Sequence, residues 1–169
     1  MARAVYAMCG IAFSGKSTAA RSIARELGLA LISLDAINEE RGLDGGKGIP
    51  DAQWEKTSLI AMDRLRSLLK AGRAVVVDDT FSHRFLRDRC GRVAEELGCR
   101  FRILFMDTPF DVIDARRRAN ASNPVRGAIE DAVFDHHRDR FQFPTNDEPV
   151  VRLRSEADLA AWIEGERAG

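Results

Sequence analysis

The chain has 169 residues, 45% of them hydrophobic and 31% charged, and its 26 basic and 26 acidic side chains give a formal net charge of zero. This composition indicates one soluble globular domain spanning residues 1–169, and the balanced charge argues against a protein that works mainly by coating nucleic acid. No run of 18 apolar residues is present, so we expect no membrane span. The first predicted strand begins too close to Met1 for a signal peptide, and the three cysteines lack metal-site spacing, which together predict a cytoplasmic protein.

A glycine-rich segment lies between a predicted strand at residues 4–9 and a predicted helix at residues 16–27. It reads Gly-Ile-Ala-Phe-Ser-Gly-Lys-Ser over residues 10–17, the pattern of a P-loop. The glycines allow a tight turn, and the loop amides together with the helix N-terminus suit a β-phosphate. Lys16 can reach the β- and γ-oxygens, and the Ser17 hydroxyl suits Mg²⁺. We therefore predict an ATP site formed by Gly10, Phe13, Ser14, Gly15, Lys16, Ser17 and Thr18.

Asp35 follows the second predicted strand, residues 30–34. A carboxylate at this strand end could accept the proton of a substrate hydroxyl, or orient that hydroxyl, for in-line attack on a γ-phosphate. The alternative is that Asp35 caps a helix beginning near Ala36. Residues 38–53 form a glycine-rich polar loop before a helix expected near 52–71, and we predict that residues 36–71 bind the substrate.

Asp78 and Asp79, followed by Thr80, end the third predicted strand, residues 74–78. An acidic residue in this position can hold Mg²⁺ through water, and one of the pair could bind substrate instead. We predict that at least one is functional. The alternative is a pair of turn-forming aspartates that cap the next helix, expected near residues 83–97.

The fourth and fifth strands are predicted at residues 102–106 and 149–153, with helices near 109–121, 127–141 and 156–164. Three consecutive arginines begin at Arg116, and Arg126 lies after a polar segment. Arginines of this kind can stabilise the charge that develops on a transferring phosphoryl group. We predict a lid at about residues 116–127 that carries Arg116 and Arg126, the alternative being a solvated helix face.

Strand-like runs alternate with helical patterns along the whole chain. This alternation predicts an α/β fold with a parallel sheet covered by helices on both faces. Ligands of such sheets bind at the carboxyl ends of the strands, where the P-loop and the aspartates are expected.

Several of these motifs together resemble a family of P-loop kinases that includes polynucleotide kinase, zeta toxin and chloramphenicol phosphotransferase, often grouped with the AAA-family ATPases. The resemblance covers nearly the whole chain. It implies a three-layer P-loop NTPase fold with a five-stranded parallel sheet in the order 2-3-1-4-5 and a helical lid that closes over ATP. The motifs are Met8–Thr18, Leu34-Asp35, Val77–Thr80, the Arg116–Arg126 segment and Arg140–Pro144.

The resemblance also implies roles for individual residues. Asp35 matches a general base, and Asp79 with Thr80 resembles a pair that contacts the acceptor. Arg116 and Arg126 correspond to lid arginines. Two further substrate-contact candidates are Asn38, which stands where polynucleotide kinases have arginine, and Arg41.

These observations predict an ATP- and Mg²⁺-dependent kinase that phosphorylates a hydroxyl of an unidentified small molecule. Asp78, Asp79 and Ser17 are the candidate metal ligands. Because Asn38 stands where polynucleotide kinases have arginine, nucleic acid is a possible but not favoured partner. The alternatives are an ATPase or switch that passes phosphate only to water, a polynucleotide 5′-hydroxyl kinase, and a kinase of nucleotide sugars resembling zeta toxin.

Overall fold

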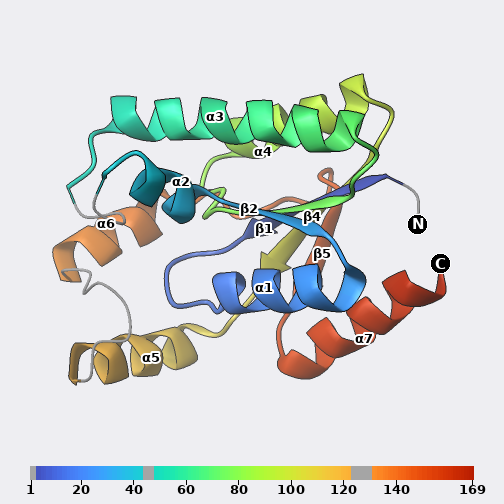
Figure 1. The fold of residues 1–169 in the computed structure, drawn as a ribbon. Helices are drawn as coiled ribbons and strands as arrows, with labels where there is room; N and C mark the ends of the chain where they lie inside the picture. Colours follow the sequence, from blue (N-terminus) through green and yellow to red (C-terminus); the bar gives the residue numbers. More distant parts are fainter. Residues whose placement is uncertain (1–2, 44–47, 123–130) are drawn as a thin grey trace.

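A computed structural model describes residues 3–43, 48–122 and 131–169 of the chain (Figure 1). Strands and helices alternate along these ranges, as the sequence predicts. The elements are β1 (Ala4–Cys9), α1 (Lys16–Leu27), β2 (Ala30–Ser33), α2 (Leu34–Glu40), α3 (Asp51–Lys70), β3 (Val75–Asp78), α4 (Arg84–Glu96), β4 (Arg100–Met106), α5 (Phe110–Ser122), α6 (Asp131–Arg140), β5 (Val150–Leu153) and α7 (Glu156–Ala168).

The five strands form one parallel sheet in the order β2-β3-β1-β4-β5, which confirms the predicted order. Strand β1 lies at the centre, paired with β3 on one side and with β4 on the other. The connection from β1 to β2 therefore runs in one direction along the sheet and the connection from β3 to β4 runs in the other, so the carboxyl end of β1 lies at the switch point where ligands of such folds bind.

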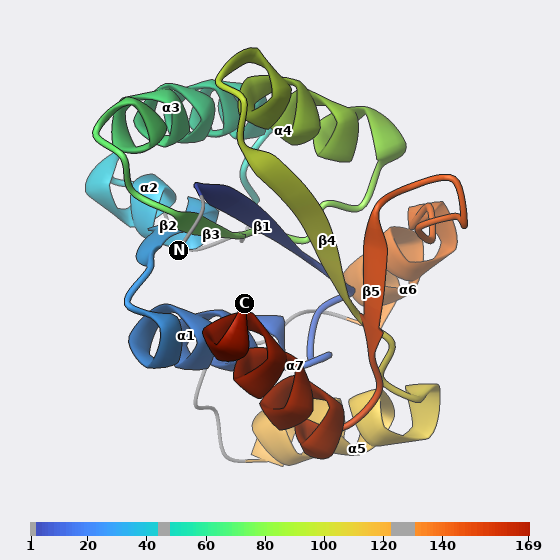
Figure 2. The same cartoon turned by 90° about the vertical axis from the view of Figure 1, so that its right-hand side faces the viewer.

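Helices cover both faces of the sheet. Figure 2 shows α3 and α4 against one face and α1 and α7 against the other. All six residues of β1 are buried, and successive side chains enter opposite cores. Val5 and Ala7 pack under α3 and α4, whereas Tyr6 and Met8 pack towards α1 and α7. This two-sided burial is why the strand reads as a continuous hydrophobic run.

The main departure from the predicted elements is the short helix α2. Strand β2 ends at Ser33, and the Ser33 hydroxyl accepts a hydrogen bond from the Ala36 N–H at 3.3 Å, so Ser33 is the N-cap. The alternative assignment of Asp35 as the cap is therefore wrong. Asp35 instead lies in the first turn, where its negative charge interacts favourably with the helix dipole. The predicted loop at residues 38–53 is also shorter than expected, because α2 extends to Glu40 and α3 begins at Asp51.

The C-terminal part of the chain completes the layer around α1. A capping box formed by Ser155 and Asp158 starts α7. The Ser155 side chain accepts a hydrogen bond from the Asp158 N–H, and the Asp158 side chain accepts one from the Ser155 N–H. No helix in the described ranges combines the length and the apolar character needed to cross a membrane.

Candidate active site

The P-loop connects the central strand β1 to α1, and its backbone requires glycine at two positions. Gly10 and Gly15 have φ values of 156° and 94°. A Cβ atom on Gly10 would lie 2.7 Å from the Ser14 hydroxyl oxygen. Phe13 also has a positive φ, 66°, although it is aromatic. These positive φ values curve the loop backbone, so that its amides can surround an anion.

Hydrogen bonds from three other segments hold this loop in place. The Gly10 N–H donates to the Thr80 carbonyl at 3.2 Å, which joins the loop to the segment after β3. Thr108, which follows β4 and was not among the predicted site residues, donates its hydroxyl to the Ser14 carbonyl at 2.8 Å. Arg116 on α5 donates to the Phe13 carbonyl at 3.2 Å. The predicted arginine therefore lies over the P-loop.

Asp78 and Asp79 lie in different surroundings, so the two carboxylates are suited to different roles. Asp78 is buried, is hydrogen-bonded to the Ser17 side chain, and has one carboxylate oxygen without a partner in the described structure. Burial raises the pKa of Asp78, and the nearby charge of Asp35 adds to the rise, whereas Lys16 opposes it. The orphaned oxygen and the Ser17 hydroxyl are hard oxygen donors and fit Mg²⁺, which takes few protein ligands and keeps several waters.

Asp79 is half-buried and lines a cavity over the P-loop. Burial raises the pKa of its carboxyl group, although hydrogen bonds from the backbone of Thr80 and Phe81 oppose the rise. Among the described residues, no group of three or more His, Cys, Asp and Glu side chains is arranged to hold a metal ion. Any metal at this site would therefore need ligands from phosphate oxygens and water as well as from the protein.

A cavity of about 2460 Å³ opens over the P-loop. Pockets for one small ligand usually measure about 300–1,000 Å³, so this cavity has room for a nucleotide and a second molecule. Its walls come from elements far apart in the sequence. Besides the P-loop they include Asp35 and Glu39 of α2, Trp54, Glu55 and Ser58 of α3, Phe85 and Leu86 of α4, Val112 and Arg116 of α5, His136 and Arg140 of α6, and Arg154 and Ser155 after β5.

Asp35 is exposed on α2 and lines the same cavity as Lys16. Its effect on the pKa of Asp78 shows that the two carboxylates lie within electrostatic range. The structure therefore brings Asp35, Asp79 and the P-loop to one cavity, as expected for side chains at the carboxyl ends of neighbouring parallel strands.

Asn38 and Arg41, the two other predicted substrate contacts, lie between α2 and α3 and do not line the cavity. Asn38 is fully buried and accepts a hydrogen bond from the Thr57 hydroxyl at 2.5 Å. Arg41 donates to that hydroxyl and to the Gln53 carbonyl and side chain. The described contacts of both residues fix α2 against α3.

Helix α6 packs against the P-loop through an aromatic contact. Phe134 is buried, with its ring centroid 6.4 Å from that of Phe13. Arg117 of α5 pairs with Asp131 of α6, and its guanidinium lies 5.2 Å from the centre of the Phe134 ring. The predicted lid therefore falls partly on α5, while Arg126 lies outside the described residues. Arg140 at the end of α6 lines the cavity and was missed as a site residue, although it belongs to a motif that carries the resemblance.

The sheet order and the P-loop define an α/β P-loop fold of the kinase-like type. A family model described as an AAA domain matches residues 5–144, and the chain belongs to this family. No curated protein is significantly similar to the chain in sequence.

Solved structures share the fold over nearly their whole length at low sequence identity. The APS kinase CysC of Mycobacterium tuberculosis, in complex with AMPPNP and APS, has a TM-score of 0.73 at 18% identity, covering 99% of this chain and 96% of that one. A gluconokinase from Sinorhizobium meliloti has a TM-score of 0.68 at 17% identity, with coverage of 98% and 96%. Kti12 of Chaetomium thermophilum, in complex with ADP-AlF3, has a TM-score of 0.77 at 12% identity, with coverage of 97% of both chains.

Proposed function

We propose that the protein is an ATP- and Mg²⁺-dependent kinase that transfers the γ-phosphoryl group to a hydroxyl of a small molecule. The observation that carries this proposal is the shared cavity, in which an exposed carboxylate, Asp35, faces the same space as the P-loop. The cavity volume of about 2460 Å³ leaves room for an acceptor beside the nucleotide. Phosphoryl transfer depends mainly on positioning and on charge stabilisation, and both are available here.

At the phosphate end, the P-loop amides and Lys16 bind the β- and γ-phosphates. Arg116, which donates to the Phe13 carbonyl, lies close enough to the loop to turn its guanidinium towards the transferring group. A guanidinium presents several donors in a planar fork and suits the charge that spreads over phosphate oxygens. Arg126 remains a predicted partner for Arg116 in this role.

Ser17 and Asp78 would hold Mg²⁺, since the Ser17 hydroxyl lies beside a buried carboxylate with one unpartnered oxygen. When bound, the ion would neutralise charge on the β- and γ-phosphate oxygens. Asp79 is then available for the acceptor, because it lines the cavity, whereas Asp78 does not line the cavity and interacts with Ser17.

At the acceptor end, Asp35 takes the proton of the attacking hydroxyl or orients that hydroxyl for in-line attack. Asp79 and Thr80 bind the acceptor from the turn after β3. Helix α6 and the lid exclude water, so that phosphate is not lost to hydrolysis. The likeness to an APS kinase and to a gluconokinase supports transfer to a small hydroxyl compound, and the acceptor itself is unidentified.

The test measures ADP release together with the transfer of ³²P from γ-labelled ATP to a panel of acceptors. The panel contains sugars, sugar acids, amino sugars, nucleotide sugars, nucleosides and 5′-hydroxyl oligonucleotides. We expect one acceptor class to stimulate ADP release and to carry the label in equal amount. Label on oligonucleotides or on nucleotide sugars would instead assign the chain to the polynucleotide-kinase or zeta-toxin type of activity.

A second candidate is a nucleotide-dependent ATPase or switch. The observation that favours it is the likeness to Kti12, solved with ADP and AlF3, a mimic of a transferring phosphoryl group. ADP release at one constant rate with every acceptor, and label found only in inorganic phosphate, would support this candidate over the kinase.

A further inference from the structure

The turn that follows β3 supplies Asp79 and Thr80 to the cavity wall, and its third residue is in an unfavourable conformation. Phe81 has a φ of 44° and is buried, with 3% of its surface exposed. Bulky residues rarely adopt a positive φ, and such a conformation persists only when the surrounding structure enforces it. The contacts of Phe81 should therefore show what holds this turn.

Arg87 on α4 provides the strongest of these contacts. Its side chain is 1% exposed, and its Nη1 atom donates to the Phe81 carbonyl and to the Gln142 carbonyl, each at 2.9 Å. The other side of the guanidinium binds the Glu148 carboxylate, with Nε and Nη2 donating at 2.6 and 3.0 Å. Glu148 is itself fixed by the Thr145 N–H, which donates to its Oε1 at 2.9 Å.

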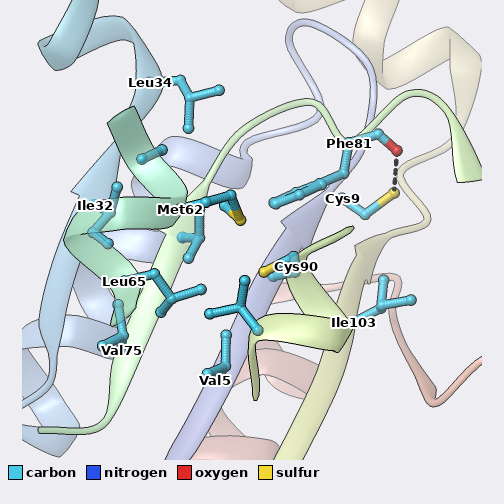
Figure 3. Close-up of a cluster of buried hydrophobic side chains, with 14 of the residues drawn as sticks. Val5, Cys9, Ile32, Leu34, Met62, Leu65, Val75, Phe81, Cys90 and Ile103 are labelled. Carbon is cyan, nitrogen blue, oxygen red and sulfur yellow. Dashed lines mark hydrogen bonds between the residues drawn. The ribbon is translucent and has the colours of Figure 1, made fainter. Parts of the chain in front are cut away.

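The turn is held from its other side by β1 and the P-loop. The Cys9 thiol donates to the Phe81 carbonyl with a distance of 3.6 Å, as the dashed line in Figure 3 shows. Burial raises the pKa of Cys9 to about 12, so the thiol stays protonated and remains a donor. The Gly10 N–H binds the Thr80 carbonyl at 3.2 Å. The carbonyls of Thr80 and Phe81 thus accept hydrogen bonds from donors on separate elements.

The orientation of the Asp79 carboxylate depends on this turn. Asp79 is the first residue of the turn and lines the cavity, so the backbone path of the turn sets where its carboxylate lies, and the N–H groups of Thr80 and Phe81 favour the charged form of that carboxylate. We propose that Arg87, fixed by Glu148, is a positioning residue that holds the 79–81 turn and thereby aims Asp79 at the acceptor. This inference rests on the proposed kinase function for its effect on transfer, but the positioning itself can be measured without an acceptor.

Stability alone does not explain why Arg87 and Glu148 form a buried ion pair behind the turn. A buried ion pair usually pays a desolvation cost that cancels much of its attraction, and well-packed apolar residues can replace it without loss. A planar guanidinium that joins two carbonyls and a carboxylate fixes directions that an apolar side chain cannot fix. The Arg87 and Glu148 pair is therefore better explained by geometry than by stability.

The first experiment removes both charges, because Arg87→Met alone would leave a buried carboxylate without a partner. The variants are Arg87→Met with Glu148→Leu, the conservative Arg87→Lys, and the control Arg167→Met. Arg167 forms a similar pair with the Glu26 carboxylate and carbonyl but is exposed on α7. Amide hydrogen exchange is measured on the ligand-free proteins, and ATP KM and acceptor kcat on the same preparations.

We expect the amides of Thr80 and Phe81 to exchange about tenfold faster in the Arg87 variants, while the amides of residues 15–17 stay unchanged. Transfer kcat should fall by about 10²-fold with little change in the KM for ATP, because the acceptor carboxylate is misplaced rather than lost. The control should match wild type in both measurements. If the double variant does not fold, Arg87→Lys is compared with wild type and with the control instead. Lysine keeps the positive charge but lacks the planar guanidinium that joins the two carbonyls and the carboxylate.

A double-mutant cycle with Asp79→Asn decides whether Arg87 acts through Asp79. If it does, adding Arg87→Lys to Asp79→Asn will cause no further loss of kcat. The proposal would be overturned if the combined variant lost kcat by the product of the two single losses. It would also be overturned if the amides of Thr80 and Phe81 exchanged at the wild-type rate in the Arg87 variants. A wild-type protein that phosphorylates no acceptor would overturn the kinase function instead, and the exchange rates would still decide whether Arg87 holds the turn.

Discussion

The two ends of the cavity are built in different ways. At the phosphate end, the binding groups come from eight consecutive residues, 10–17, shaped by local backbone geometry between β1 and α1. At the acceptor end, the wall combines α2, α3, α4 and the turn after β3, and contacts between separate elements hold α2 against α3 and hold the turn against α4 and β1. The P-loop presents its binding groups from one segment, which contacts from three other segments support, whereas the acceptor wall is itself assembled from several elements and depends on how its helices pack.

This difference predicts that changes at the phosphate end affect every activity of the protein, and that changes at the acceptor end affect transfer alone. It also predicts that supporting residues outside the cavity matter mainly for the acceptor. Substitutions at each end of the cavity test this division.

Lys16→Ala should reduce both ATP hydrolysis and phosphoryl transfer by about 10³-fold, because a charged group that stabilises the transition state is lost from the site. Steady-state kinetics of ADP release, with and without an acceptor, measure the effect. Lys70→Ala, at the exposed end of α3, is the matched control and should behave as wild type. Transfer that survives in Lys16→Ala would contradict the assignment of the phosphate end.

Asp35→Asn should leave ATP binding intact and reduce transfer by about 10²-fold or more, since the substitution removes a general base and keeps the shape of the side chain. Binding of a fluorescent ATP analogue and the kcat for the labelled acceptor separate the two effects. Asp63→Asn, on the exposed face of α3, is the control. An unchanged kcat in Asp35→Asn would show that the base lies elsewhere.

Asp78→Asn should stabilise the ligand-free protein by about 2 kcal/mol at a pH above the raised pKa of Asp78, because it removes a buried charge with an unpartnered oxygen. Burial raises the pKa of Asp78, so the ionised form is less favourable in the folded chain than in the unfolded chain. The free energy of unfolding therefore decreases as pH rises from the ordinary value through the raised pKa.

Thermal unfolding at a series of pH values checks this expectation. The gain in melting temperature of Asp78→Asn should be full above the raised pKa of Asp78 and should vanish below the ordinary pKa of an aspartate. Mg²⁺-dependent turnover should be lost in the same variant. Equal melting temperatures of variant and wild type across the whole pH range would contradict the role of burial.

Thr57→Val should have the smallest effect, a loss of about 1 kcal/mol in stability together with a higher KM for the acceptor. The Thr57 hydroxyl joins Asn38 and Arg41 between α2 and α3, and its loss loosens the helix that carries Asp35. Thr57→Ser keeps the hydroxyl and serves as the control. An equal rise in the KM for ATP would show that the two ends of the cavity are not independent.

Much of the site followed from local sequence patterns. The P-loop was predicted because its function needs glycines, lysine and serine at fixed spacing, and the sheet because buried parallel strands are continuously apolar. The position of Asp35, Asp79 and Arg116 at one cavity follows from their places after the strands and on α5. Asn38 and Arg41 were predicted as substrate contacts but lie between α2 and α3, since nothing in their local sequence shows which way a short helix turns its side chains.

Residues adjacent in the chain carry enough information to predict a P-loop in a parallel α/β sheet, because glycine spacing and continuous apolar strands are local patterns. Three further relations are visible only in the folded chain: Asp78 is the aspartate beside Ser17, Thr108 supports the P-loop, and Arg87 and Glu148 meet behind the turn at Phe81. These relations join residues 61 to 94 positions apart, or depend on which side of a strand end a carboxylate faces. Packing of the whole chain sets them, and no local pattern encodes them.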